Sequence, residues 1–161
     1  MSIRLMSFIS FLAVCTILGT SAYLQIHDGF VPCPLCTLQR VAFVALGILF
    51  LLNILVYKIT IARIFSQLLI LASAAAGMVL AGRQVWLQLF HAGEEGECGV
   101  SLQYMLDVLP LNEVMAKVFA GSAECAKRGF SFLWLNMAEW SLLLFVGFFI
   151  VGLSLLFCKK Q

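Results

Sequence analysis

Charged residues are scarce in this chain. Of its 161 residues only 11% are Asp, Glu, Lys or Arg, whereas 63% are hydrophobic. A soluble domain usually carries about 25% charged residues, because its surface has to be hydrated. The composition therefore excludes an ordinary soluble domain and indicates an integral membrane protein. The sequence also lacks a hydrophilic linker, an internal repeat and a low-complexity tract, so we expect a single membrane domain over residues 1–161.

Four apolar runs are long enough to cross a bilayer, which takes about 20 residues in a helix. The first run could instead be a cleaved signal peptide, since Arg4 precedes it, but it exceeds the roughly 7–15 apolar residues of such peptides. We therefore predict an all-α membrane protein, a bundle of four transmembrane helices. The predicted helices span roughly residues 3–24, 38–57, 61–81 and 137–158, and the connections on the outer side span roughly 25–37 and 82–136.

Basic residues near the ends of the runs predict the orientation of the bundle. Cytoplasmic flanks of membrane helices are enriched in Lys and Arg. Five basic residues fall on one side of the predicted membrane: Arg4, Lys58, Arg63, Lys159 and Lys160. Both termini are therefore expected in the cytoplasm, and the connections 25–37 and 82–136 on the outer side. In a bacterium that side of the inner membrane is the periplasm, where disulfides persist.

The motif Cys33-Pro34-Leu35-Cys36 stands just before the second apolar run. If Cys33 caps the helix and Pro34 is its first residue, the missing N–H of proline costs no hydrogen bond. The two sulfurs can then close a disulfide, and the helix N-terminus stabilises a thiolate, the reactive form of cysteine. Arg40 follows one turn beyond Cys36 on the same face, where its cation can stabilise a thiolate or an anion on a neighbouring ligand. Alternatively, Arg40 reaches lipid phosphates and the cysteines form an inert disulfide.

Cys98 and Cys125 are the other cysteines of the outer connections, and they could form one structural disulfide. Glycines and glutamates surround Cys98 in segment 93–99, and such a mobile approach suits a cysteine that has to meet a partner. The four outer cysteines could also bind zinc. The second pair lacks zinc-site spacing, however, and an oxidising compartment favours disulfides, so we expect no metal. Cys15 and Cys158 fall within predicted helices and resemble ordinary small apolar residues.

Two other patterns receive structural interpretations. The long outer connection carries Leu111, Met115 and Val118 at helical spacing. This pattern predicts a short amphipathic helix in the membrane surface, with a helix in a soluble loop as the alternative. In the third run, Ser73 and Gly77 belong to a stripe of small residues that favours close helix packing.

Taken together, these features resemble the DsbB family of bacterial inner-membrane thiol:quinone oxidoreductases. A lone Cys-x-x-Cys would be a weak signal, whereas four cysteines, an arginine and four helices in this order cover nearly the whole chain. The resembling stretches are Pro32-Cys33-Pro34-Leu35-Cys36 followed by Arg40, Leu109-Pro110-Leu111, and Gly121-Ser122-Ala123-Glu124-Cys125-Ala126 running to Phe132-Leu133.

The resemblance implies a relay of electrons. A reduced periplasmic thioredoxin-like oxidase of the DsbA type would attack the disulfide between Cys98 and Cys125, with Cys98 forming the mixed disulfide. Cys33 would exchange with that pair, and Cys36 would face a bound quinone, ubiquinone or menaquinone, with Arg40 stabilising the developing charge. The implied partners are the DsbA-type oxidase, the membrane quinone and the lipid bilayer, and no nucleic acid is expected.

A non-catalytic alternative stays open from the sequence. The chain could be a four-helix membrane scaffold whose external disulfides brace its loops. Arg40 on the cysteine face and the glycine-rich flank of Cys98 favour the enzyme, because a brace needs neither. The family pattern leaves Cys15, Cys158 and His91 without an assigned role.

Overall fold

The computed structural model describes residues 3–27, 33–90, 107–110, 112–114, 131–132 and 134–157. Its four long helices are each long and apolar enough to cross a membrane. They are α1 (Ile3–His27), α2 (Pro34–Leu55), α3 (Thr60–Phe90) and α7 (Met137–Phe157). The predicted bundle of four transmembrane helices is confirmed. The predicted amphipathic helix lies mainly outside the described residues, within which 112–114 form one helical turn.

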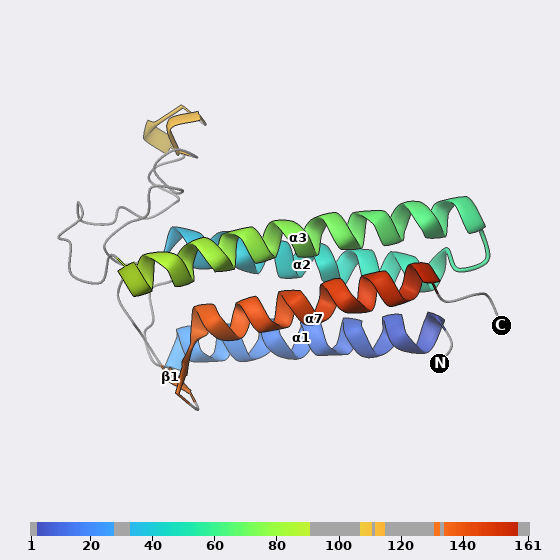
Figure 1. Cartoon of the computed structure of the whole chain (residues 1–161), viewed down its shortest axis with the longest axis horizontal. Coiled ribbons are helices and arrows are strands. Elements are labelled where there is room, and N and C mark those ends of the chain that lie inside the picture. The colour runs from blue at the N-terminus through green and yellow to red at the C-terminus, as the bar shows by residue number, and fades with distance from the viewer. Residues whose placement is uncertain are drawn as a thin grey trace.

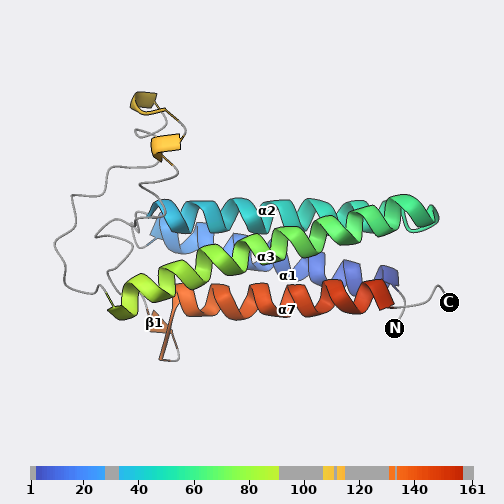
Figure 2. The same cartoon turned by 45° about the horizontal axis from the view of Figure 1, so that its top comes forward.

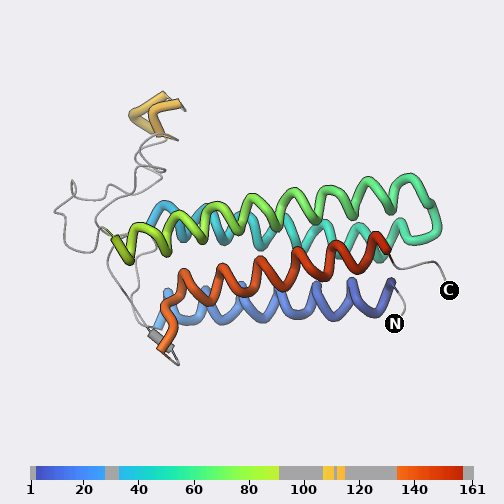
Figure 3. Tube along the Cα trace, viewed as in Figure 1, coloured from blue at the N-terminus to red at the C-terminus, as the bar shows by residue number. Residues whose placement is uncertain are grey.

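The four helices lie side by side along the long axis of the molecule, and the view turned by 45° shows the same arrangement (Figures 1 and 2). The start of α1, the end of α7 and the turn between α2 and α3 share one end of the bundle (Figure 3). Helix α2 packs between α1 and α3, and α3 packs along α7. By contrast, α1 and α7 contact each other little, and this weak contact matters for the site described below.

An aromatic stack and a glycine determine how closely α3 approaches α7. The rings of Phe43 and Phe145 stack with centroids 4.1 Å apart and planes 12° from parallel. A Cβ atom on Gly77 would lie only 2.2 Å from a ring carbon of Phe145. Gly77 is therefore required for the ring to lie against α3. The expected packing role of the small-residue stripe is confirmed, and Ser73 in the same stripe donates a hydrogen bond to a carbonyl of α2.

The outer surface of the bundle is strongly apolar, and several polar side chains lie in its interior. Leucine, isoleucine, valine and phenylalanine side chains are exposed along all four helices, whereas several polar side chains are buried between them. Exposed apolar surface of this extent is unusual for a soluble protein and fits contact with lipid. The buried polar side chains of the four helices include Ser7, Ser10, Asn53, Ser66, Gln67, Gln84 and Gln88.

A small hairpin precedes α7, and the sequence analysis did not anticipate it. Strands β1 (Ser131–Phe132) and β2 (Leu135–Asn136) pair in antiparallel fashion, with Trp134 in the turn at a φ of 71°. The backbone N–H of Asn136 donates a hydrogen bond of 2.8 Å to the Glu139 carboxylate. A carboxylate three residues into a helix commonly satisfies the N–H group at the cap. Glu139 therefore helps to define where α7 begins.

Two helices are longer than the sequence analysis expected. Helix α2 begins at Pro34 instead of near residue 38, and α3 continues to Phe90 instead of ending near residue 81. At 1.5 Å per residue, α3 is about 46 Å long, which exceeds the roughly 30 Å hydrocarbon core of a bilayer. The sequence after residue 81 is interrupted by Arg83 and Gln84 and therefore resembles a connection. In the fold it continues the helix and passes beside the start of α2.

Candidate functional site

Cys33 caps the N-terminus of α2, as the sequence predicted. Its backbone is extended, with φ −65° and ψ 161°, and its sulfur accepts a hydrogen bond from the N–H of Cys36 at 3.4 Å. The carbonyl of Cys33 accepts the first helical bond, from the N–H of Thr37 at 3.0 Å. Pro34 begins the helix, where a missing N–H leaves no bond unmade. A sulfur thus occupies the place that a serine hydroxyl or aspartate carboxylate usually takes.

The two sulfurs of the motif lie close together. The Cys33 thiol donates to the Cys36 sulfur across 3.0 Å. Joining them requires only a small side-chain adjustment, because a disulfide is about 2 Å long and the Cα atoms already belong to one helical turn. Cys33 is buried, with 5% of its surface exposed, and Cys36 is half-buried. The pair can therefore alternate between dithiol and disulfide with little movement of the backbone.

A buried amide on α3, which the sequence pattern did not predict, contacts both sulfurs. The Gln84 Nε2 atom lies 3.1 Å from the Cys36 sulfur and 3.7 Å from the Cys33 sulfur. The Gln84 side-chain oxygen accepts a hydrogen bond of 2.7 Å from Gln39 Nε2 on α2. One available signal was the presence of glutamines in an apolar helix, because polar side chains at membrane-helix interfaces often bond across helices.

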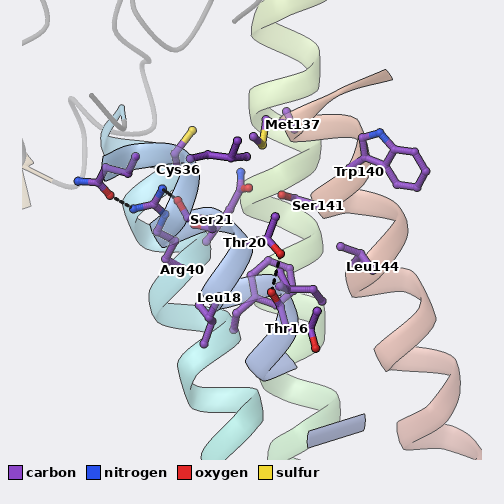
Figure 4. Close-up of a pocket in the computed structure, with 16 residues that line it drawn as sticks. Thr16, Leu18, Thr20, Ser21, Cys36, Arg40, Met137, Trp140, Ser141 and Leu144 are labelled. Atoms are coloured by element: carbon purple, nitrogen blue, oxygen red, sulfur yellow. Dashed lines mark hydrogen bonds between the residues drawn. The ribbon is translucent and has the colours of Figure 1, made fainter. Parts of the chain in front are cut away.

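A cavity of about 550 Å³ opens between α1, α2 and α7. It exists where α1 and α7 contact each other little. Cys36, Gln39 and Arg40 line it from α2, and its other walls are largely apolar, with Leu144 and Trp140 contributed by α7. Figure 4 shows these side chains, with the Cys36 sulfur and the Arg40 guanidinium on the same helix. The site thus joins one reactive sulfur and one cation to an apolar space between membrane helices.

Helix α1 holds the Arg40 side chain in the cavity wall. One guanidinium nitrogen, Nη1, donates to the side-chain oxygen of Gln25, and Nη2 donates to the carbonyl of Ser21 at 3.3 Å. Arg40 is half-buried. Two hydrogen bonds to one neighbouring helix restrict the guanidinium, which therefore fixes a positive charge at the cavity wall.

The two cysteines of the motif have different surroundings. Cys36 lines the cavity. Cys33 is buried in an apolar cluster with Leu35, Leu87 of α3 and Val114 of the long connection, and Cys36 packs against the edge of that cluster. The connection that contributes Val114 is the one that carries Cys98 and Cys125 in the sequence. Of the two cysteines, Cys36 lines the cavity, whereas Cys33 is buried in the cluster that includes a residue of the connection.

Several predicted or considered residues lie outside the described part of the chain or away from the cavity lining. Cys98 and Cys125 lie outside the described residues, as do Cys158 and His91. Cys15 is exposed on α1, and it is not among the described residues that line the cavity. Within the described ranges, no group of three His, Cys, Asp or Glu side chains is arranged to hold a metal ion.

Comparison with known proteins gives a consistent result. The family model described as "Disulfide bond formation protein DsbB" matches residues 3–155. The disulfide bond formation protein B of Hahella chejuensis is 37% identical over 145 residues, which cover 90% of this chain and 88% of that protein. Its counterpart in Azoarcus sp. is 37% identical over 155 residues, covering 95% and 92%. That of Psychrobacter cryohalolentis is 41% identical over 139 residues, covering 84% and 79%. With the family model covering nearly the whole chain and relatives at this level of identity, the chain belongs to the DsbB family of disulfide bond formation proteins.

Proposed function

We propose that this protein is a protein-thiol:quinone oxidoreductase that generates disulfides. It reoxidises a periplasmic oxidase of the DsbA type and passes the electrons to a membrane quinone. The observation that carries this proposal is that Cys36 and Arg40 line one apolar cavity between membrane helices, while Cys33 lies 3.0 Å from the Cys36 sulfur. A disulfide that merely braced a loop would not need an adjoining cavity or an oriented cation.

The cavity has the size and chemistry that a quinone head group requires. Its volume of about 550 Å³ falls within the roughly 300–1,000 Å³ of ligand pockets, which are mostly apolar with a few placed polar groups. Phe43 and Leu144 offer apolar surface for a ring, and Gln39 and Arg40 offer N–H groups for its oxygens. When bound, a quinone supplies a lipid-soluble acceptor of two electrons and two protons.

Arg40 supplies the positive charge of the site. Its guanidinium is oriented by Gln25 and Ser21 before any ligand binds. A cation fixed in an apolar site stabilises developing negative charge more strongly than one in water, because it does not have to reorganise. Arg40 can therefore stabilise negative charge on a ligand oxygen or on the Cys36 sulfur one turn away.

The two cysteines divide the work between the connection and the cavity. In the proposed relay, the Cys33–Cys36 disulfide oxidises the Cys98 and Cys125 thiols and is itself reduced to two thiols. Closing it again releases two electrons and two protons, for which a quinone held by Gln39 and Arg40 would be the acceptor. Cys33 exchanges with the connection, consistent with its place in one buried cluster with Val114, and Cys36 lines the cavity. Cys98 forms the mixed disulfide with the DsbA-type oxidase.

The proposed location is the bacterial inner membrane. The cysteine motif stands at the end of the bundle opposite the start of α1 (Figure 1). Arg4 and Lys58 lie at the other end, where Arg4 stacks 4.2 Å over the ring of Tyr57. Because basic residues favour the cytoplasmic side, this arrangement supports cytoplasmic termini and periplasmic redox cysteines.

The deciding experiment is turnover with purified components. Reduced DsbA-type oxidase is mixed with the protein and with ubiquinone or menaquinone without oxygen, and quinol and oxidised substrate are both measured. We expect one quinol for each substrate disulfide formed. A scaffold with structural disulfides would produce neither. Cys125→Ser should trap a mixed disulfide through Cys98, and persistence of that adduct in the Cys98→Ser, Cys125→Ser variant would show that the oxidase attacks the Cys33 pair directly.

A further inference from the structure

Gln84 has an unusual position for a neutral side chain in a membrane bundle. Only 3% of its surface is exposed, and burying an amide in an apolar environment is unfavourable unless its groups are hydrogen-bonded. Its NH₂ group lies 3.1 Å from the Cys36 sulfur and 3.7 Å from the Cys33 sulfur. The partners of this buried donor are thus the two atoms on which the proposed chemistry takes place.

Gln39 determines which end of the Gln84 amide faces the sulfurs. An amide has an oxygen that accepts and an NH₂ group that donates hydrogen bonds. Because Gln39 Nε2 donates to the Gln84 oxygen at 2.7 Å, the Gln84 NH₂ group is directed toward the cysteine pair. Gln39 is itself 3% exposed, and it stands one turn beyond Cys36 on α2. The two glutamines therefore form an oriented chain from the cavity wall to the sulfurs.

We propose that Gln84 is a catalytic hydrogen-bond donor to the cysteine pair, and that Gln39 is the positioning residue that directs its NH₂ group. The proposal rests on the thiol–disulfide exchange described under the proposed function. It adds a neutral hydrogen-bond donor that stabilises the negative charge formed on a cysteine sulfur. Arg40 bonds to α1 at the cavity wall, whereas Gln84 contacts the sulfurs themselves.

The exchange reaction forms a negative charge on the sulfur to which the Gln84 NH₂ group donates a hydrogen bond. When a thiolate of the connection attacks the Cys33 sulfur, a new disulfide forms there and the Cys33–Cys36 bond breaks. The bonding electron pair stays on Cys36 as a thiolate, so no other oxidant or reductant takes part. That sulfur is the one closer to the Gln84 NH₂ group. Hydrogen bonds to an ionised acceptor are stronger than those between neutral groups, so Gln84 favours the opened state over the closed disulfide.

The first test measures the reactivity of Cys36 without quinone or oxidase. The fully reduced protein is treated with iodoacetamide at neutral pH, and modification of Cys36 is followed by tandem mass spectrometry, since only the thiolate reacts. Gln84→Met removes the donor and nearly keeps the side-chain volume. We expect it to slow alkylation of Cys36 by about tenfold, the lower end of what a hydrogen bond to a charged group contributes.

Gln88 provides the matched control. It lies one turn further along α3 and is also buried, with 5% of its surface exposed. Gln88→Met therefore removes a comparable amide from the same helix, and alkylation of Cys36 should stay within about twofold of the unchanged protein, the scatter of a site that does not contact the sulfur. Equal slowing in both variants would overturn the proposal, because it would show a general effect of losing a buried amide.

Gln39→Met tests the positioning role. It should slow alkylation severalfold, and the Gln39→Met, Gln84→Met variant should be no slower than Gln84→Met alone, because residues acting through one contact are not additive. Gln84 is not among the described residues that line the cavity. In turnover, Gln84→Met should therefore lower kcat and leave the KM for quinone nearly unchanged.

Unchanged alkylation of Cys36 in Gln84→Met overturns the proposal. If that variant loses its helical circular dichroism, Gln84→Asn repeats the test, because its shorter side chain withdraws the NH₂ group from the sulfurs. Unchanged alkylation in Gln84→Asn is then equally decisive against it. Since the assay contains neither quinone nor oxidase, slowed alkylation in a protein that fails to reduce quinone would refute the proposed function alone.

Discussion

Two buried amide sites near opposite ends of the bundle differ in their hydrogen bonding. At the cysteine end, Gln39 and Gln84 are hydrogen-bonded to each other and to sulfur. Toward the opposite end, the Asn53 side chain is fully buried, and neither its nitrogen nor its oxygen has a hydrogen-bond partner among the described residues. Buried polar groups are usually satisfied. The comparison indicates that the Gln39 and Gln84 amides are ordered around the reactive sulfurs, whereas Asn53 has no comparable local partner.

If this comparison is right, variants at the two ends affect different properties. Changes at the cysteine end should lower turnover while the helices remain folded. Changes in the rest of the bundle should alter stability and leave the chemistry intact. The variants below test that separation, from the largest expected effect to the smallest.

Cys36→Ser should abolish quinone reduction, because one sulfur cannot return to a disulfide and release two electrons. Quinol formation with a reduced DsbA-type oxidase measures the effect. Cys15→Ala is the control, since Cys15 is exposed on α1 and is not among the described residues of the cavity wall, and its turnover should match the unchanged protein. Full quinone-dependent turnover in Cys36→Ser would end the proposed mechanism.

Arg40→Ala should lower kcat by about a hundredfold and raise the KM for quinone, because an oriented donor for developing charge is removed. Arg40→Lys should mainly raise the KM, since an ammonium lacks the planar fork of the guanidinium. Exchange between Cys98 and the oxidase, measured without quinone, should survive both changes. Unchanged quinone kinetics in both variants would assign Arg40 to lipid anchoring.

The architecture of this site was predictable where it depends on local sequence. Apolar runs predicted the four helices, and the placement of Pro34 predicted that Cys33 caps α2. Gln84 was not predictable in the same way. Its sequence neighbours resemble a connection, and only the packing of α3 beside the start of α2 brings its amide to the sulfurs. The cavity likewise arises from how little α1 and α7 contact each other, which periodicity within one helix does not encode.

The hairpin before α7 shows the same limit. Its strands are two residues each, too short for the alternation that identifies a strand in a sequence. Trp134 adopts a positive φ in the turn, a conformation that local preferences assign to glycine or asparagine. From the sequence alone, Glu139 is most simply an interface residue. In the structure its carboxylate accepts a hydrogen bond from the backbone N–H of Asn136 and so caps α7.

Gly77→Ala should destabilise the bundle by about 1–3 kcal/mol, the usual cost of overpacking a core. The added carbon would lie 2.2 Å from a ring carbon of Phe145, and the stack with Phe43 prevents the ring from moving freely. Gly82→Ala on the same helix is the control. A Cβ there meets nothing within 4 Å among the described residues, so this variant should keep or raise stability, because alanine favours a helix over glycine.

Thermal unfolding in detergent, followed by circular dichroism, compares the two glycine variants. Cys36 alkylation in the folded Gly77→Ala protein should change little, because Gly77 packs against α7 and not against the sulfurs. Equal stability of Gly77→Ala and Gly82→Ala would show that α3 and α7 are not held as closely as their contact indicates.

Asn53→Leu should have the smallest effect and the opposite sign. Leucine has the same number of side-chain heavy atoms and the same branch point as asparagine but no polar atoms, so the change removes two groups that lack protein partners in the described structure. Replacing an unsatisfied buried amide in this way should raise stability by roughly 1 kcal/mol, seen as a higher Tm with unchanged turnover. Gln84→Leu is the matched change at the cysteine end. It removes an amide that bonds to Gln39 and the cysteine sulfurs, so it should lower turnover. If Asn53→Leu instead lowered both Tm and turnover, Asn53 would have a bonded partner in the membrane, and the contrast between Asn53 and Gln84 would fail.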